Sequence, residues 1–475
     1  MTTAPAGLNG PRAAARPRLI RALNEQLLLG HIRDAGPCSR ADLARRSGLS
    51  KPTVSQALAT IEQAGLVRAA GQQLGRPGRS ALLYEIRPEA GFVLGLDVGA
   101  QYLRGALADL SGEVRARAAA RTRATGGPSR AGELVALAES LCAQAGLALG
   151  AITQTVIGSP GVYDPRRGAI SLTGGLPGWE RPAVLARLRV AFGPEMLVEN
   201  DIDAAALAER AHGHGQQVDS FAFVSVGTGI GMGLVIGGQL FRGAHGVAGE
   251  IGYMPMTGGH GGDPADARRR GALEAAASAP AVVRAARRSG LRGQVSARRV
   301  FAAAARGDER AAAVVAEEAE LVARVLCAIV TVVDPELIVL GGGIGQAPGF
   351  AAAVSEHLHR ISPVEPVVRV SALGTDAVVD GALAAATDLA WTRLAGNLPA
   401  TSAPPDGAAP GTAAHLPSPD SDGDGDGAAP ARTRAMNPPP RTGARLPRVG
   451  PAAPTPRAGP SPGGGPAVRR QKACG

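Results

Sequence analysis

The chain has 475 residues, which exceeds one ordinary hydrophobic core and predicts two or more folded units. Apolar residues make up 45% and charged residues 19%, a balance that fits a folded, soluble protein and excludes one that is disordered throughout. The net charge of +10 rests almost entirely on arginine and is compatible with a phosphate-rich partner without requiring one.

Cysteine spacing and hydropathy indicate the compartment. The four cysteines lie far apart with no CxxC spacing, so we expect neither a disulfide framework nor a thiolate zinc site. The best apolar run, 325–333, is far too short to cross a bilayer, and the first residues lack the apolar core of a secretion signal. We therefore expect a cytoplasmic protein with no membrane partner.

Composition changes divide the chain into four segments. We expect a flexible N-terminal arm at 1–17, a helical DNA-binding domain at 18–88 and an α/β domain at 89–395, in which short apolar strands alternate with Ala-rich helices. The Pro/Gly/Ala-rich tail at 396–475 has too few large apolar residues to offset chain entropy. We expect this tail to be disordered.

Residues 39–67 predict two short helices joined by a sharp turn. Gly48 ends the first helix, Ser50 can cap the second, and Pro52 suits its first turn. Apolar residues repeat at helical spacing along the second helix and leave a polar side free. A helix-turn-helix that reads the major groove has this layout, although an ordinary αα-hairpin would share it. The predicted DNA contacts in this region are Arg40, Ser50, Lys51, Thr53, Ser55 and Gln56.

Two strand-like pieces follow Val67 and enclose a Gly-rich loop that carries Arg76 and Arg79. Such a wing can place arginine at the minor groove or at phosphates. The alternative is that these two arginines only solubilise a linker. Together with the helix pair, the loop predicts a winged helix-turn-helix.

Three predicted strands of the α/β domain end in glycines, at 92–99, 221–233 and 337–343. Unhindered backbone amides at such junctions can surround an anion, and Asp97 could hold a metal or a phosphate through water. A glycine run can also be only a tight hairpin. The predicted nucleotide or phosphate-loop residues are Asp97, Gly99, Gly227, Thr228, Gly229, Gly231, Gly341 and Gly342.

The segment MLVENDIDAAALAE, 196–209, predicts a strand followed at once by a helix, with polar residues at the junction. Asn200 and Asp201 could bind sugar hydroxyls there. The structural alternative is that Asp201 only caps the helix.

With GLSKPTVS at 48–55 and GRPGR at 75–79 ahead of these junctions, the sequence resembles the ROK family, which groups transcriptional repressors with sugar kinases on an actin-like fold. The resemblance runs from the helix-turn-helix to about residue 394. It implies the repressor branch, because only that branch carries an N-terminal DNA-binding module. The implied fold is a winged helix-turn-helix followed by an actin-like, ribonuclease H-like α/β domain of the two-lobed sugar-kinase type.

The resemblance also implies residue roles. In the kinases of the family, the Asp that matches Asp201 is the general base on the sugar hydroxyl. Tyr253 stands where the family usually has His. The implied sugar-binding residues are Asn200, Asp201, Glu250, Tyr253 and Glu274.

Several positions depart from the kinase pattern. Ala100 and Gln101 follow the first Gly-bearing motif and remove a hydroxyl from the phosphate side, and Gly175 replaces an Asn before Leu-Pro-Gly-Trp. The stretch 253–274 lacks the family's zinc-binding cysteines, so zinc and other metals are not expected. ATP and magnesium would be needed only by a kinase.

These features favour a sequence-specific DNA-binding regulator, expected to be a repressor of carbohydrate-metabolism genes. Its expected partners are operator DNA, a sugar or sugar-phosphate effector, and further copies of itself in a homodimer or homotetramer. The alternative is an ATP-dependent kinase of a hexose or amino sugar with an appended DNA-binding module. A third possibility is a regulator that answers to a protein partner instead of a small molecule.

Overall fold

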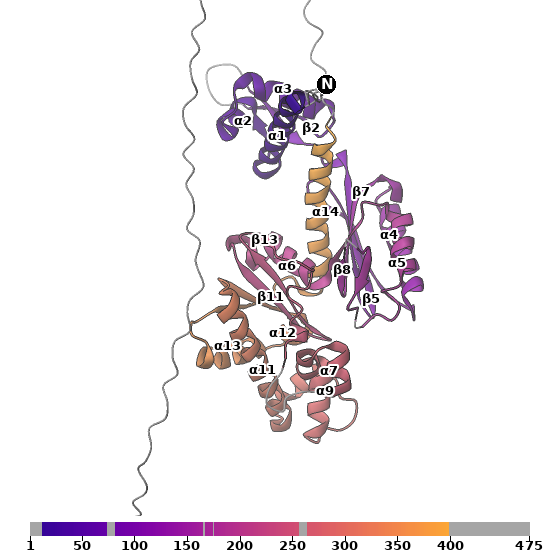
Figure 1. The fold of residues 1–475 in the computed structure, drawn as a ribbon, viewed down its shortest axis with the longest axis vertical. Helices are drawn as coiled ribbons and strands as arrows, with labels where there is room; N and C mark the ends of the chain where they lie inside the picture. The colour runs from indigo at the N-terminus through magenta and orange to yellow at the C-terminus, as the bar shows by residue number, and fades with distance from the viewer. Residues whose placement is uncertain (1–11, 74–80, 165–166, 174, 256–263, 399–475) are drawn as a thin grey trace, which may run out of the picture. The chain divides into compact units, whose positions relative to one another are not determined.

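The computed structural model describes residues 12–73, 81–164, 167–173, 175–255 and 264–398, which belong to one compact unit (Figure 1). Helix α1 (Arg12–Ala35) begins inside the segment expected to be a flexible arm, because alanine and arginine at 12–16 favour helix. At the other end, helix α14 (Ala377–Gly396) runs just past the predicted start of the tail. The tail from 399 onward lies outside the described residues. No described helix is both long and apolar enough to cross a membrane.

The N-terminal module packs three helices beside a small antiparallel sheet. Its further elements are β1 (Cys38–Ser39), α2 (Arg40–Ser47), α3 (Lys51–Gln63), β2 (Val67–Gln73) and β3 (Ala81–Ile86), with strand order β1-β3-β2. Leu43, Val54, Leu58 and Ile61 are fully buried between the helices. The predicted winged helix-turn-helix is confirmed.

A mixed five-stranded sheet forms the first lobe of the α/β domain, with strand order β10-β7-β4-β5-β6. Its strands are β4 (Phe92–Val98), β5 (Tyr102–Asp109), β6 (Val114–Arg121), β7 (Ile152–Ser159) and β10 (Leu197–Asn200). Helices α4 (Gly127–Gln144) and α5 (Pro182–Phe192) share one hydrophobic cluster with this sheet, and a small hairpin is formed by β8 (Val162–Asp164) and β9 (Ala169–Ser171).

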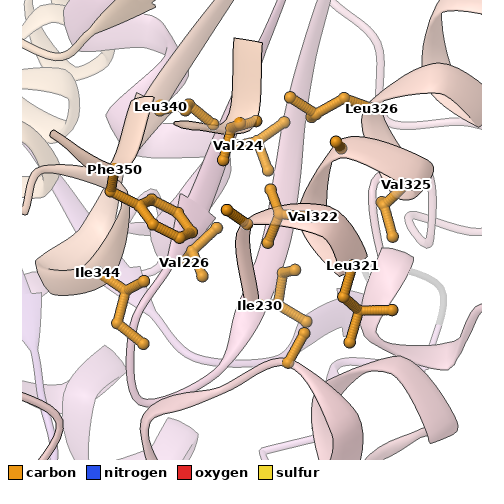
Figure 2. Packing of buried hydrophobic residues seen from close by; sticks show 14 of the residues in the cluster. Val224, Val226, Ile230, Leu321, Val322, Val325, Leu326, Leu340, Ile344 and Phe350 are labelled. Carbon is orange, nitrogen blue, oxygen red and sulfur yellow. The ribbon is translucent and has the colours of Figure 1, made fainter. Parts of the chain in front are cut away.

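The second lobe has another mixed sheet, of order β13-β12-β11-β14-β15. Its strands are β11 (Phe221–Val226), β12 (Ile230–Ile236), β13 (Gln239–Leu240), β14 (Leu337–Gly341) and β15 (Val367–Val370). Figure 2 shows its core, where Val224, Val226 and Leu340 of the sheet meet Val322 of α11 (Glu309–Val333) and Phe350 of α13 (Phe350–Ile361). Further helices are α7 (Pro264–Arg270), α8 (Ala272–Ala276), α9 (Ala279–Arg288), α10 (Ala297–Ala304) and α12 (Gly342–Gly345).

Helices α6 (Asp201–His212) and α14 pack closely against each other. A Cβ at Gly381 would collide with the backbone oxygen of Ala204, so glycine is required at this crossing. Figure 1 shows α14 alongside the first sheet, where it contacts β4 and β7. The two sheets with their covering helices confirm the predicted two-lobed α/β domain.

Candidate functional site

The helix pair of the N-terminal module is fixed by caps at both ends of its turn. Gly48 ends α2 in the left-handed conformation, with φ of 69°, which glycine adopts without strain. The Ser50 hydroxyl accepts a hydrogen bond from the backbone N–H of Thr53 at 3.3 Å and thereby starts α3. The cap holds the N-terminal turn of α3 in a defined position.

The predicted DNA contacts on α3 divide into exposed and capping groups. Lys51, Ser55 and Gln56 are exposed, whereas Thr53 is half-buried, with its hydroxyl oxygen 2.8 Å from that of Ser50. The exposed side is therefore available to base edges and phosphates at the helix N-terminus.

Arg40, at the start of α2, is exposed and oriented by β3. Its Nη2 donates to the Tyr84 hydroxyl at 2.6 Å, and its guanidinium lies 5.2 Å from the centre of that ring. This leaves a preorganised charge on the surface of the module. Arg76 and Arg79 of the predicted wing lie outside the described residues.

In the α/β domain, Asn200 rather than Asp201 provides the cap of α6. Its Oδ1 accepts from the backbone N–H groups of Ile202 at 2.8 Å and Asp203 at 3.1 Å, and its Nδ2 donates to the Gly161 carbonyl at 3.1 Å. Asn200 thus has a structural role beside the ligand role expected for it. The half-buried Asp201 accepts from the N–H of Ile202 at 2.9 Å through one oxygen.

Glu274 is tied to the glycine turn between β11 and β12. Its Oε2 accepts from the backbone N–H of Ile230 at 3.2 Å, and a Cβ on Gly229 would lie 2.5 Å from that oxygen. Arg270 donates from Nε to the other oxygen at 2.6 Å. Both oxygens of the predicted sugar-contacting carboxylate therefore already have protein partners.

The second and third predicted glycine junctions lie next to each other. Strands β11 and β14 pair in parallel, and a Cβ on Gly227 would lie 3.4 Å from the backbone nitrogen of Gly343. Gly341 and Gly342 turn the chain directly into α12, with Gly342 at φ of 77°. The structure therefore brings these backbone amides together at the end of one sheet.

Asp97 closes the first junction at the end of β4. The carboxylate is buried and accepts from Arg104 Nη1 at 3.0 Å, while the N–H of Gly99 donates to the Tyr102 carbonyl at 3.0 Å. Burial, with the nearby charge of Asp201, raises the pKa of Asp97 to about 7 against the opposing effect of Arg104. The electrostatic interaction between Asp97 and Asp201 links the first predicted glycine junction to the predicted sugar-binding residues.

Carboxylates concentrate around Asp201. Burial raises the pKa of Asp201 to about 6, and the charge of Glu250 adds to the increase. Burial also raises the pKa of Glu250, helped by Glu274, and the pKa of Tyr253 increases for the same reasons, burial first and Glu250 next. The charges of Glu250 and Glu274 thus act on Asp201 and Tyr253, and the charge of Glu274 acts on Glu250.

An ion pair between Arg242 and Glu199 lies beside Asp203, and the sequence motifs did not predict it. Arg242, after β13, donates from Nε to both oxygens of Glu199 at 3.2 Å and makes a third, shorter contact from Nη2. Burial and the charge of Glu199 raise the pKa of the neighbouring Asp203 to about 8. No fixed spacing links Glu199 and Arg242, so their ion pair could not be predicted as a motif. The ion pair of Arg270 with Glu274 could have been predicted, because the two residues are four apart on the sequence, as in a helical ion pair.

This arrangement can bind hydroxyl groups and place one carboxylate as a base. Asp201, with a pKa between that of free aspartate and neutrality, is suited to accept a proton or a hydroxyl hydrogen bond. At the paired glycine turns, the N–H of Gly227 already donates to the Gly229 carbonyl at 2.9 Å and that of Ile230 donates to Glu274, so these two amides are engaged within the protein. Ala100 and Tyr253 provide neither the polar group nor the imidazole of the kinase pattern, and the chain has no cysteine between 253 and 274 for a thiolate zinc site.

Comparison with known proteins agrees with this architecture. The model of the ROK family matches residues 93–388, and the model of the MarR family matches residues 23–76. The xylose repressor of Caldicellulosiruptor bescii is 26% identical over 72% of this chain and 88% of its own length. Several other curated relatives match over less than two thirds of their own length.

Two solved structures share the fold. A ROK family transcriptional regulator described as a homologue of the E. coli MLC protein covers 79% of this chain and 98% of its own, at 25% identity and a TM-score of 0.67. The ROK hexokinase of Thermus thermophilus covers 62% of this chain and 97% of its own, at 32% identity and a TM-score of 0.54. Since the family match extends over more than half of its residues, the chain belongs to the ROK family.

Proposed function

We propose that this protein is a sequence-specific DNA-binding transcriptional regulator, a repressor of carbohydrate-metabolism genes that a sugar or sugar derivative controls. The observation that carries the proposal is the N-terminal turn of α3, which is capped by Ser50 and exposes Lys51, Ser55 and Gln56. A capped, polar helix in a winged module is built to enter the major groove. The repressor names of the relatives support the same reading.

The ligand site of the proposal comprises Asp201, Glu250, Tyr253 and Glu274, with Asn200 positioning Asp201 at the start of α6. Carboxylates beside the exposed phenol of Tyr253 can bind the neighbouring hydroxyls of a sugar. Occupation of the site would shift the population of a DNA-binding conformation, and operator recognition would use two winged modules of a homodimer or homotetramer in the cytoplasm. The xylose repressor relatives make pentoses the first sugars to test, with hexoses beside them.

A second candidate is an ATP-dependent kinase of a hexose or amino sugar. Asp201 as the base and the amides around Gly227 and Gly342 favour it, and Asp97 could bind magnesium through water if ATP were bound. Against it, Asp97 is engaged by Arg104, and Ala100 removes a polar group from the phosphate side. The kinase therefore remains the alternative.

The experiment that tests the proposal starts from purified full-length protein. DNA fragments that it retains are sequenced, and a panel of pentoses, hexoses and amino sugars is then screened for release of the retained fragment. Enrichment of one sequence and its release by a sugar are expected. Retention without any sequence preference would overturn the regulator proposal.

A further inference from the structure

Positive charge is concentrated in one stretch of the α/β domain. Between residues 275 and 307 the chain has seven arginines and no aspartate, glutamate or lysine. The rest of the domain, 89–274 and 308–395, has 30 carboxylate residues against 21 arginines and is acidic. A general preference of the sequence for arginine does not explain this contrast, because such a preference would not remove the carboxylates from one stretch.

The stretch forms helices α9 and α10 and the segments beside them, which pack on one another and on α11. Val282 and Ala286 of α9 and Val300 of α10 are buried in their shared core, and the exposed arginines lie on the outer sides of the helices. Arg310 of α11 joins them, because a Cβ on Gly290, just after α9, would lie 2.9 Å from its Nη1. The exposed arginines of this surface, which we call the arginine face, are Arg287, Arg288, Arg292, Arg298, Arg299, Arg306 and Arg310.

The charge of the arginine face is not neutralised within the described part of the chain. None of its seven side chains forms an ion pair with a described carboxylate, whereas Arg270, Arg324 and Arg360 of the same lobe each pair with a glutamate four residues away. Asp308, the first carboxylate after the stretch, accepts from the N–H of Ala311 and caps α11. Seven like charges repel one another and lower the stability of the fold. Solubility alone does not require them, since a mixture of both signs serves it as well.

The surroundings of the arginine face favour a phosphate polymer over a protein or a membrane. Guanidinium groups bind phosphate oxygens through paired hydrogen bonds. No large hydrophobic residue that the structure describes between 264 and 331 is exposed, so the surface lacks the apolar anchors that protein and membrane partners use. Phe301, the one aromatic residue of the stretch, packs edge-on against Phe350 with ring centres 5.5 Å apart and is not free to stack on an unpaired base. The arginine face therefore fits the backbone of a duplex.

We propose that the arginine face binds the phosphate backbone of duplex DNA without sequence preference, as a contact separate from that of the winged module. The choice of DNA rests on the proposed function, because a regulator held at its operator meets duplex phosphates at high local concentration. Each phosphate that an arginine neutralises releases counterions from the duplex, so this contact adds affinity that decreases steeply with salt. The winged module reads the sequence, and the arginine face adds affinity that every sequence shares.

Neutralising part of the arginine face tests the proposal in the full-length protein. Arg287→Gln, Arg288→Gln and Arg292→Gln are combined in one variant, and its affinity for a labelled DNA duplex of random sequence is measured by fluorescence anisotropy at several salt concentrations. A loss of at least tenfold is expected at low salt. The slope of log affinity against log salt should become shallower by about 2 to 3, roughly one for each charge removed. Since the substitutions relieve repulsion between like charges, the variant should melt no earlier than the parent.

The matched control removes the same number of charges elsewhere in the α/β domain. Arg121, Arg123 and Arg369 are also exposed and form no ion pair with a described carboxylate, and all three are replaced by glutamine. This control variant should bind the random duplex within about twofold of the parent, because only the net charge changes. An equal loss in the two variants, or no loss in the arginine-face variant, overturns the proposal. Tighter binding of an RNA duplex of the same length than of the DNA duplex overturns the choice of DNA.

The same titrations separate this inference from the proposed function. The arginine-face variant should keep the parent's ratio of affinities for a selected and a random duplex, whereas Ser55→Ala with Gln56→Ala should lower that ratio. A parent chain without any sequence preference, whose binding still depends on the arginine face, would refute the proposed function and leave this inference standing.

Discussion

Arg270 donates from Nε to Oε1 of Glu274 at 2.6 Å, and its Nη2 donates to the Thr228 carbonyl at 2.9 Å. Glu274 in turn accepts from the N–H of Ile230. The arginine thus joins the end of α7 to the glycine turn through a carboxylate predicted to contact sugar. We expect the turn at 227–230 to depend on this ion pair for its position.

Replacing Arg270 by Ala is expected to destabilise the protein by about 1 to 3 kcal/mol, because the partly buried Glu274 loses its charged donor. Urea unfolding measures the change. Arg324→Ala is the control, since Arg324 pairs with Glu320 at the surface, with both side chains about half exposed, and its loss should cost less than about 1 kcal/mol. Equal losses in the two variants would show that the Arg270 pair does not fasten the turn.

The reading helix makes a separate prediction. Ser55→Ala and Gln56→Ala should each reduce specific DNA affinity by about 1 to 3 kcal/mol if the side chain hydrogen-bonds to a base edge, and should relax sequence preference. Gel-shift titrations with the selected fragment measure this. Gln63→Ala, at the far end of the same helix, is the exposed control and should change little. Unaltered affinity in both test variants would remove α3 from the reading role.

Glu318 predicts a pH dependence of stability. It is buried in α11, its Oε1 has no hydrogen-bond partner among the described residues, and burial raises its pKa from 4.5 to about 8. The folded chain holds a proton that the unfolded chain releases above pH 4.5, so this group's contribution to stability is full below pH 4.5 and is lost as the pH rises toward 8.

Glu318→Gln removes that titration. The slope of unfolding free energy against pH should become less negative between pH 5 and 8, by up to about 1.4 kcal/mol per pH unit. Glu317→Gln, at the exposed neighbouring position, should leave the slope as it is. A slope that is identical in the parent and Glu318→Gln would place the ionised form of Glu318 in the folded state.

Local patterns predicted much of the fold. The helix-turn-helix could be predicted from Gly48, Ser50 and Pro52, because caps and turns depend on residues that are adjacent in sequence. The strands before Gly99 and Gly227 were found for the same reason, as apolar runs that end in glycine. The helical start at Arg12 was not expected, since the prolines near it indicated a flexible arm.

The site was predicted less completely. The resemblance identified Asp201 and Glu274, but the pair of Glu199 with Arg242 joins a strand to a distant loop, and no periodicity relates them. The division of roles between Asn200 and Asp201 was also beyond the sequence, because either side chain can cap a helix and only the backbone geometry decides. Whether these residues bind a sugar is still a prediction.

The most direct test of the regulator proposal compares two activities of one protein at Asp201. Operator release and coupled ADP release are measured over the same panel of sugars, with the parent and with Asp201→Asn. Asp201→Asn should bind the operator as the parent does when no sugar is present, because the substitution leaves α3 unchanged. It should also need more sugar for release, since the substitution removes a charged hydrogen bond worth roughly 1.5 to 3 kcal/mol. Sugar-driven release by the parent without ADP formation is expected. Asp201-dependent ADP formation at ordinary kinase rates, with no sugar that releases the DNA, would contradict the regulator proposal.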